Sequence, residues 1–124
     1  GGVEELAAFE RIGVIVDALI GYGLDGPIRD PARSLVEEMH RRESRIVSLD
    51  VPSGIDATTG ETLGTAVHPE TTVTLALPKM GLRTCPGQLV LADIGIPRVV
   101  YDRLDIAYDD PFGREWWIEL ATGD

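Results

Sequence analysis

The chain has 124 residues, a length suited to one small domain with one hydrophobic core. Hydrophobic residues make up 44% of it and no Gly/Ser-rich or Pro-rich linker divides it, so its composition is globular rather than disordered. Its net charge of −10 argues against nonspecific binding to nucleic acid or anionic lipid. No apolar run approaches the roughly 20 residues needed to cross a membrane, and the acidic start is no secretory signal, so we expect a cytoplasmic protein.

The first part of the chain predicts a strand, a loop and a helix. Residues Ile12–Gly21 (IGVIVDALIG) are rich in β-branched side chains and predict a strand that is buried on both faces. A loop dense in glycine and proline follows, and Asp30 can cap the next helix with Pro31 at its first position. The segment PARSLVEEMHRR gathers apolar residues on one face and basic residues at its C-terminal end, which favours an amphipathic helix.

The later part predicts three more strands and little helix. The strands are expected at Arg45–Val51, Thr71–Pro78 and Gln88–Pro97. A short helix is expected through RVVYDRL, whereas PFGREWWIEL has no clear pattern. The passage from Val14 to Val51 is one βαβ unit, with parallel strands and a right-handed crossover. An α/β layered fold follows, in which ligands bind at the carboxyl ends of the strands.

Three candidate functional features fall at or just after predicted strand ends. Asp17 lies near the end of the first strand, and the glycine-containing loop 21–27 follows directly. Asp50 lies at the end of the second strand, with Ser53 just beyond it. Because neighbouring parallel strands end at the same edge of a sheet, we expect these groups to converge on one crevice.

This pattern has a structural interpretation and a functional one. Asp17 could be a turn or cap residue, the glycines could serve a tight turn, and Asp50 could bond the PSG turn that follows it. In the functional interpretation, glycines let backbone N–H groups approach a phosphate, and a strand-end carboxylate exchanges protons with a substrate. A carboxylate, a hydroxyl and backbone carbonyls also suit an alkali or alkaline-earth cation better than zinc. Taken together, the three features favour the functional interpretation.

Other reactive side chains are weaker candidates. Cys85 is the single cysteine, which excludes an internal disulfide, and no histidine near it in sequence would activate it as a nucleophile. His40 falls in the last turn of the predicted helix and His68 in a loop, without the spacing of a catalytic triad or a metal site. Lys79 ends the third strand, where a ligand phosphate could reach it, but we predict a solvated lysine there.

Four segments occur in the order and at the spacing of a known family: VDALIGYGLDGPIRDP, VSLDVPSGIDATTGE, TVTLALPKMGL and ADIGIP. Together they resemble the C-terminal half of the YjeF N-terminal domain family, the NAD(P)H-hydrate epimerases. The resemblance covers roughly residues 13–97, and DVPSGID followed by TG is its most telling part.

This resemblance implies a three-layer αβα fold of Rossmann-like type with a mainly parallel sheet. It also implies an isomerase that interconverts the R and S forms of hydrated NADH or NADPH. Asp50 would match the family's catalytic aspartate, which also contacts the substrate, and Asp17 and Ser53 would match two ligands of a potassium ion. The loop that holds the substrate would comprise Gly21, Tyr22, Gly23, Leu24, Asp25, Gly26 and Pro27.

The implied reaction suits a carboxylate at Asp50. The hydrate is a hemiaminal, because its hydroxyl sits on the ring carbon beside nitrogen. The nitrogen can expel that hydroxyl when an acid protonates it, and water can then add to the other face when a base accepts a proton. One carboxylate can serve both steps, and such proton transfer contributes about 10²- to 10⁴-fold in rate.

Part of the family domain has no counterpart in this sequence. Family members carry an upstream loop rich in Asn and Gly, which helps hold the phosphates and supplies another potassium ligand, and nothing in Gly1–Ile12 matches it. We therefore expect residues 1–124 to form a single, incomplete domain that is inactive alone or works only beside its missing half. An exposed sheet edge and apolar surface should then need another chain to cover them.

The resemblance also suggests partners. Family members often pair as homodimers, and bifunctional relatives carry a fused dehydratase, so we expect a dinucleotide substrate, a second copy and a fused or separate dehydratase. Neither nucleic acid nor a membrane is expected. The alternative function is a noncatalytic module that binds a nucleotide such as ADP-ribose, or a protein.

Overall fold

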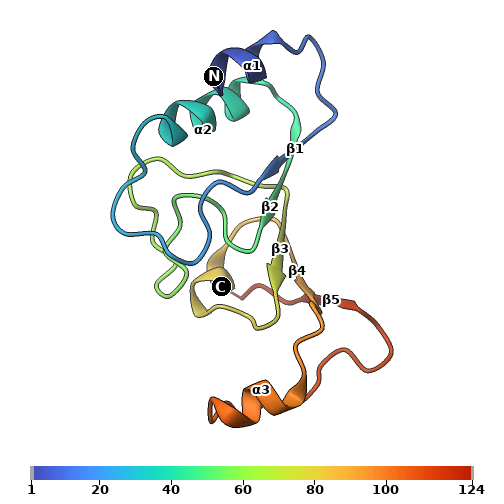
Figure 1. Cartoon of the computed structure of the whole chain (residues 1–124). Helices are drawn as coiled ribbons and strands as arrows, with labels where there is room; N and C mark the ends of the chain where they lie inside the picture. The colour runs from blue at the N-terminus through green and yellow to red at the C-terminus, as the bar shows by residue number, and fades with distance from the viewer. Residues whose placement is uncertain (1, 124) are drawn as a thin grey trace.

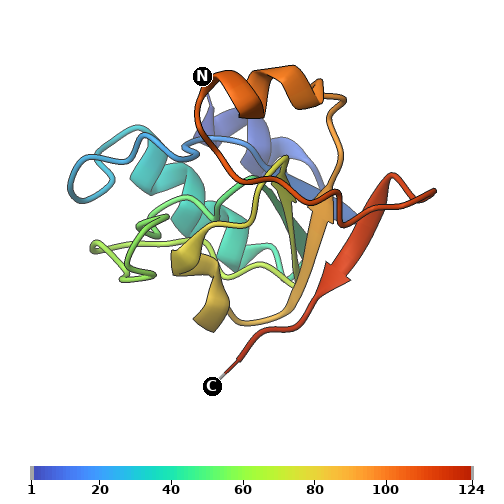
Figure 2. The ribbon, with the colours of Figure 1, turned by 90° about the horizontal axis from the view of Figure 1, so that it is seen from below.

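The computed structural model describes residues 2–123 and consists of one five-stranded sheet with helices around it (Figures 1 and 2). The helices are α1 (Val3–Ala8), α2 (Ala32–Arg41), the 3₁₀-helix η1 (Met80–Thr84) and α3 (Arg98–Arg103). The strands are β1 (Val14–Asp17), β2 (Arg45–Leu49), β3 (Thr71–Leu75), β4 (Gln88–Ala92) and β5 (Trp117–Leu120). No helix in this described part of the chain is long and apolar enough to span a bilayer.

The sheet follows the order of the sequence, β1-β2-β3-β4-β5. The first four strands run parallel and β5 pairs antiparallel with β4. The α/β class and the mainly parallel sheet predicted from the sequence are therefore confirmed. The carboxyl ends of β1, β2 and β3 lie at one edge, which is where the candidate residues were expected.

Helix α2 and η1 cover the same side of the sheet (Figure 2). Two apolar clusters form beneath them. The first joins α2 to β1 and β2 through Ile15, Ile28, Val36, Met39, Ile46 and Val67, and the second surrounds η1 with Val51, Ala57, Leu82, Cys85 and Leu89. The predicted N-cap is one residue too early, because α2 begins at Ala32 and Pro31 holds the N-cap position, although Asp30 Oδ1 still accepts the Ser34 N–H in the first turn at 3.2 Å.

The opposite side of the sheet remains largely uncovered in the described part of the chain. The first strand was predicted to be buried on both faces, and this is wrong: Val14 and Val16 are 50% and 62% exposed. The register places them on the same side as Leu49 and Trp117, which are also exposed. A β-branched apolar sequence thus forms a strand here without both faces being packed, and one outer layer of the expected three is not among residues 2–123.

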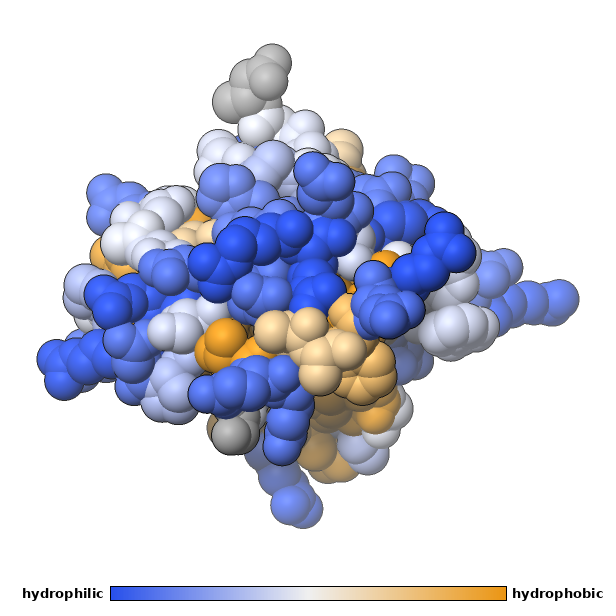
Figure 3. Space-filling view, turned by 90° about the horizontal axis from the view of Figure 1, so that it is seen from above, coloured by the Kyte–Doolittle hydropathy of each residue, from blue (hydrophilic) through white to orange (hydrophobic). Residues whose placement is uncertain are grey.

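A second apolar surface lies where α1 meets β1. A cavity of about 410 Å³ opens there, lined by Leu6, Phe9, Arg11, Ile12, Gly13, Val14 and Ile15. Figure 3 looks at the molecule from the α1 end and shows apolar side chains gathered in the lower half of an otherwise hydrophilic face. The exposed apolar surface therefore extends from the outer sheet face to this end of the molecule.

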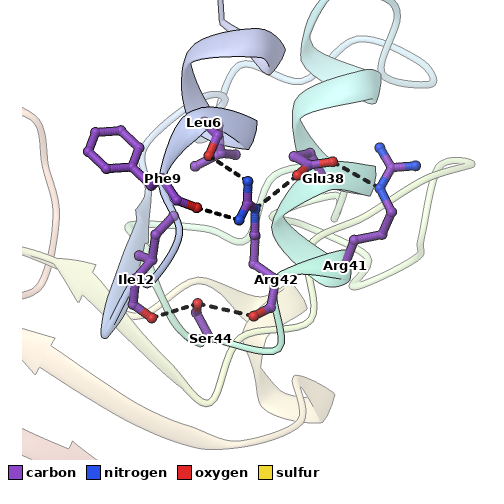
Figure 4. A network of polar contacts seen from close by, with 7 residues as sticks. All are labelled: Leu6, Phe9, Ile12, Glu38, Arg41, Arg42 and Ser44. Atoms are coloured by element: carbon purple, nitrogen blue, oxygen red, sulfur yellow. Dashed lines mark hydrogen bonds and ion pairs between the residues drawn. The ribbon is translucent and has the colours of Figure 1, made fainter.

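Helix α1 is attached to α2 by the side chain of Arg42 (Figure 4). Its guanidinium donates to the carbonyl of Phe9 at 2.6 Å and to the carbonyl of Leu6 at 3.0 Å, while Nε bonds Glu38 at 2.9 Å. Leu6 lies in the last turn of α1 and Phe9 is the residue that follows the helix, where carbonyls lack the regular intrahelical donors. Arg42 therefore supplies side-chain hydrogen bonds to the C-terminal end of α1.

Each predicted strand is shorter in the structure, and one strand was missed. The strands end at Asp17, Leu49, Leu75 and Ala92, before the predicted ends at Gly21, Val51, Pro78 and Pro97. At two of these ends the next residue leaves the extended conformation, because Asp50 has φ 69° and Ala76 has φ 63°. Strand β5 lies within PFGREWWIEL, a segment without a clear sequence pattern.

Candidate functional site

Asp17 ends β1 with a carboxylate that is fully buried. Ser48 donates its hydroxyl to Oδ2 at 2.7 Å, and the backbone N–H of Ser53 donates to the same oxygen at 2.9 Å. The Ser53 hydroxyl donates to Oδ1 at 2.6 Å. A buried charge is tolerated only when such donors replace its water, so this cluster fixes the ends of β1 and β2 together.

Ser53 also holds the start of the predicted substrate loop. The backbone N–H of Ile20 donates to the Ser53 hydroxyl oxygen at 2.9 Å, and the Ile20 carbonyl lies 3.2 Å from the same oxygen as a second acceptor. The loop is therefore tied to Asp17 through one serine. Carboxylate, hydroxyl and carbonyl oxygens meet at this point, which is a donor set suited to a hard cation.

Asp50 directly follows β2 in a left-handed conformation, with φ 69°. Few residues other than glycine adopt it, and it costs of the order of 1–3 kcal/mol. The conformation turns the side chain toward β3, where Oδ1 accepts the N–H of Leu75 at 3.3 Å and faces the Thr74 hydroxyl at 3.4 Å. Asp50 therefore does not make the local bond to the PSG turn that the structural interpretation required. Its carboxylate is about 22% exposed.

Lys79 is not the solvated lysine predicted from the sequence. Its side chain is only 15% exposed, and Nζ donates to Oδ1 of Asp50 at 2.6 Å. The chain reverses at Ala76, after β3, and brings the lysine back over the strand end. The ammonium of Lys79 thus pairs with the carboxylate that follows the neighbouring strand β2, whereas a lysine in a loop normally keeps its charge in water.

The loop 21–27 meets the site at its first residue. A Cβ placed on Gly21 would lie 3.5 Å from Oδ2 of Asp50, so the loop backbone passes directly beside this carboxylate. Tyr22 is 67% exposed, whereas Leu24 is partly buried and packs against the apolar cluster beneath α2. A cavity of about 500 Å³ lies along the loop and the start of α2, lined by Ile20, Gly23, Leu24, Asp25, Pro27, Ile28, Arg29, Asp30, Pro31 and Ala32.

The predicted residues thus converge, but in two separate environments. Asp17 and Ser53 form a sealed cluster below the loop, whereas Asp50 and Gly21 lie at the surface. Asp50 is not among the residues that line the cavity beside the loop. The single hollow expected between the two aspartates is therefore replaced by one buried and one accessible carboxylate that share the same loop.

Sequence reasoning missed the partners of both aspartates. Ser48 and Thr74 are fully buried polar residues, and Thr72 beside them is 1% exposed. Their alternation with apolar residues in VSL and TTVTL was a usable signal, since it places hydroxyls on the α2 side of the sheet. Lys79 left no comparable signal, because its direction depends on the turn at Ala76.

The remaining reactive side chains lie elsewhere. Burial raises the pKa of the Cys85 thiol, which favours its unreactive form. His40 and His68 contact each other with ring centroids 5.1 Å apart, and partial burial lowers the pKa of His40. No group of three or more His, Cys, Asp or Glu side chains within residues 2–123 is arranged to hold a metal ion.

Comparison with known proteins adds to this geometry. The chain is 42% identical over 113 residues to an NAD(P)H-hydrate epimerase of Dehalogenimonas lykanthroporepellens, covering 90% of this chain and 46% of that protein. It is 46% identical over 93 residues to a bifunctional NAD(P)H-hydrate repair enzyme Nnr of Salinibacter ruber, covering 71% of this chain and 17% of that protein. The chain thus spans about half the length of the epimerase and less of the bifunctional enzyme.

A solved structure is also similar. The crystal structure of the yeast protein YNL200c matches with a TM-score of 0.71 at 26% identity, over 95% of this chain and 50% of the yeast chain. The model of the family described as YjeF-related protein N-terminus matches residues 3–81. This range begins upstream of the motifs and includes α1, β1, α2, β2, β3 and the two aspartates. Since it covers more than half of the sequence, the chain belongs to the family of YjeF-related protein N-termini.

Proposed function

We propose that this chain carries the catalytic aspartate of an NAD(P)H-hydrate epimerase and acts in the repair of hydrated NADH and NADPH. The names of the relatives support this reaction, and one structural observation supports Asp50 as the catalytic residue. Asp50 is a partly exposed carboxylate at a strand end, held in an unfavourable backbone conformation beside Gly21 of the loop 21–27. Residues held in this way concentrate at active sites.

In the proposed reaction, Asp50 handles both proton transfers. Its protonated form gives a proton to the leaving hydroxyl of the hemiaminal, and the ring nitrogen expels water to form an iminium. A water molecule then adds to the other face of the ring and returns its proton to the carboxylate. Water and proton are conserved over the cycle, so only the configuration at one carbon changes.

The loop 21–27 is proposed to bind the dinucleotide. Backbone N–H groups near Gly21, Gly23 and Gly26 can approach a phosphate closely, because no Cβ stands in the way. The exposed ring of Tyr22 offers a flat apolar surface for a base or the hydrated ring. This arrangement supports recognition of a dinucleotide despite the acidic charge of the chain.

Potassium is proposed as the cation of the buried cluster. Asp17 and Ser53 would hold it, and the Ile20 carbonyl is a third oxygen in reach of Ser53. The donor chemistry fits, since all of these are hard oxygen ligands. When bound, the cation would offset the charge of Asp17 and stiffen the start of the loop. Thermal unfolding in KCl against equimolar NaCl should give a higher Tm for the wild type but not for Ser53→Ala.

Partners are proposed from the same comparisons. A dehydratase, either fused or separate, would consume one of the two epimers, as the bifunctional relatives suggest. A second copy is the other candidate partner, and sedimentation analysis tests it. The exposed outer face of the sheet supports a further proposal, that another part of a longer family domain covers it when the site is working.

The function is tested with a single epimer of NADPH hydrate, followed by NMR as the other epimer forms. We would assay the chain alone and a chimera in which it replaces its matching segment in the Dehalogenimonas epimerase. The chimera should exceed the spontaneous rate, and Asp50→Asn should lower its turnover by about 100-fold or more while ligand still binds. Asp56→Asn is the matched control, because its side chain bonds Thr58 and Thr59 of its own turn.

Two results would contradict this proposal. Retained turnover in Asp50→Asn would remove the role of that carboxylate. Binding of ADP-ribose without any epimerisation in the chimera would favour a noncatalytic nucleotide-binding module instead.

A further inference from the structure

Lys79 makes a complete set of hydrogen bonds at the end of β3. Its Nζ donates to Oδ1 of Asp50 at 2.6 Å, to the carbonyl of Leu75 at 2.7 Å and to the Thr74 hydroxyl at 3.0 Å. An ammonium has three hydrogens, so each has an acceptor. The side chain is 15% exposed. A lysine with this geometry is fixed in place and is not free to reach a ligand phosphate.

The two carboxylate oxygens of Asp50 have different surroundings. Oδ1 receives Lys79 and also lies within reach of the Leu75 N–H and the Thr74 hydroxyl, at 3.3 and 3.4 Å. Within residues 2–123, no donor is found for Oδ2, which instead faces the backbone of Gly21. One oxygen is thus held by the protein and the other points toward the proposed substrate loop.

The backbone supports this asymmetry from both strands. Asp50 and Ala76 each directly follow adjacent parallel strands, and both have positive φ, at 69° and 63°. The first turns the carboxylate toward β3, and the second turns the chain so that Lys79 returns to the carboxylate. An ordinary surface ion pair would need neither conformation, since long side chains on exposed loops find partners without backbone strain.

We propose that Lys79 is a positioning residue which holds Oδ1 of Asp50, so that Oδ2 alone is presented to the substrate. This inference rests on the proposed epimerase function. In that reaction the same oxygen would give a proton to the leaving hydroxyl and take one from the adding water. A carboxylate free to rotate would lose this fixed position, and positioning of a catalytic group is sensitive to displacements of less than 1 Å.

A direct test uses the isotope-labelled 124-residue chain. NMR should detect the Lys79 ammonium as a slowly exchanging signal, with a scalar coupling across the hydrogen bond between its Nζ and the Asp50 carboxyl carbon. Absence of this coupling in a folded wild-type chain would overturn the proposal. The measurement does not depend on turnover, so it remains decisive if the proposed function is wrong.

A kinetic test uses whichever form turns over in the assay above. Lys79→Met should lower kcat by about 10- to 100-fold with KM within threefold, the range usual for residues that orient a catalytic group. Lys79→Arg should recover part of the loss because it restores a cation near Oδ1, and Arg83→Met is the matched control on exposed η1 surface. A folded Lys79→Gln serves as the second variant if Lys79→Met does not fold.

The outcomes separate the two proposals. A chimera without epimerase activity contradicts the epimerase function and leaves the coupling to decide on Lys79. An active wild type with unchanged kcat in folded Lys79→Met and Lys79→Gln refutes the role of Lys79 and leaves the function intact. An equal loss in Lys79→Met and Arg83→Met would also refute it, because it would indicate a general structural effect.

Discussion

Ser53 binds Asp17 through both carboxylate oxygens, with its hydroxyl at 2.6 Å from Oδ1 and its backbone nitrogen at 2.9 Å from Oδ2. Because Ser53 lies three residues after Asp50, this contact also anchors the turn that carries the proposed catalytic carboxylate. The same hydroxyl accepts the Ile20 N–H at the start of the loop. One serine therefore sets the relative position of the buried carboxylate, the exposed carboxylate and the loop between them.

Asp17→Asn should destabilise the fold by about 1–3 kcal/mol, because asparagine offers one acceptor oxygen where aspartate offers two to buried donors. Urea unfolding at neutral pH measures the change. Asp93→Asn is the matched control: Asp93 is exposed and accepts one N–H from Gly95, which an amide oxygen can also accept. A loss no larger than the control's would mean that the cluster around Asp17 is not needed for stability.

Gly54→Ala should cost about 3 kcal/mol or more. Gly54 has φ 96°, and a Cβ there would overlap the carbonyl oxygen of Thr65 and lie 2.6 Å from the Cα of Ala66. The overlap is with backbone, which cannot move aside as a side chain can. Gly13→Ala, where a Cβ meets nothing within 4 Å, should change the free energy of unfolding by less than about 0.5 kcal/mol. Similar urea midpoints for the two variants would contradict this account.

The positions of the candidate residues could be predicted, but their surroundings could not. Hydrophobic runs and the βαβ pattern are local properties, so they placed Asp17 and Asp50 at neighbouring strand ends. The direction of each side chain depends instead on one backbone dihedral angle, at Asp50 and at Ala76. Neither residue is a glycine, so the sequence carried no signal for a left-handed conformation, and the contact of Lys79 was missed for this reason.

The layers of the fold were predictable only in part. Alternation within a strand shows which residues share a face, but not what packs against it, so the exposure of Val14 and Val16 could not be read from the chain. Strand β5 was missed because a strand of four residues is too short to show a clear alternation of apolar and polar side chains. Its extended conformation depends instead on pairing with β4, which the local sequence does not reveal.

Arg42→Lys should loosen α1 while leaving the sheet intact. One ammonium cannot span the carbonyls of Leu6 and Phe9 together with Glu38, and each charged hydrogen bond contributes about 1.5–3 kcal/mol. Amide hydrogen exchange in α1 should accelerate by roughly tenfold or more, with little change in β2 and β3. Arg41→Lys is the control, since that side chain is 64% exposed and pairs with Glu38 alone. Equal exchange rates in both variants would show that α1 is held by its apolar contacts instead.

The contact between the two histidines should make stability depend on pH. The backbone N–H of His68 donates to Nε2 of His40 at 3.2 Å, which requires a neutral imidazole at that nitrogen. Partial burial lowers the pKa of His40, and repulsion from His68 lowers it further. An unfolded histidine titrates near pH 6.5.

The sign of the effect follows from proton binding. Below about pH 6.5 the unfolded chain takes up a proton at position 40 before the folded chain does, so falling pH favours unfolding. The free energy of unfolding should therefore be fully retained above this pH and decrease as the pH falls through the lower pKa of the folded state. Asp30 and Asp56, whose pKa values are lowered by hydrogen bonds, titrate well below this window.

Urea unfolding at pH 7.5, 6.5 and 5.5 measures this dependence in the wild type and in His40→Gln. The glutamine oxygen can still accept the N–H of His68 but does not titrate, so the decrease toward pH 5.5 should become smaller. His68→Gln removes the repulsion but leaves His40 partly buried, so it should keep part of the decrease, since burial is the larger cause. An identical pH dependence in the wild type and His40→Gln would place the titrating group elsewhere.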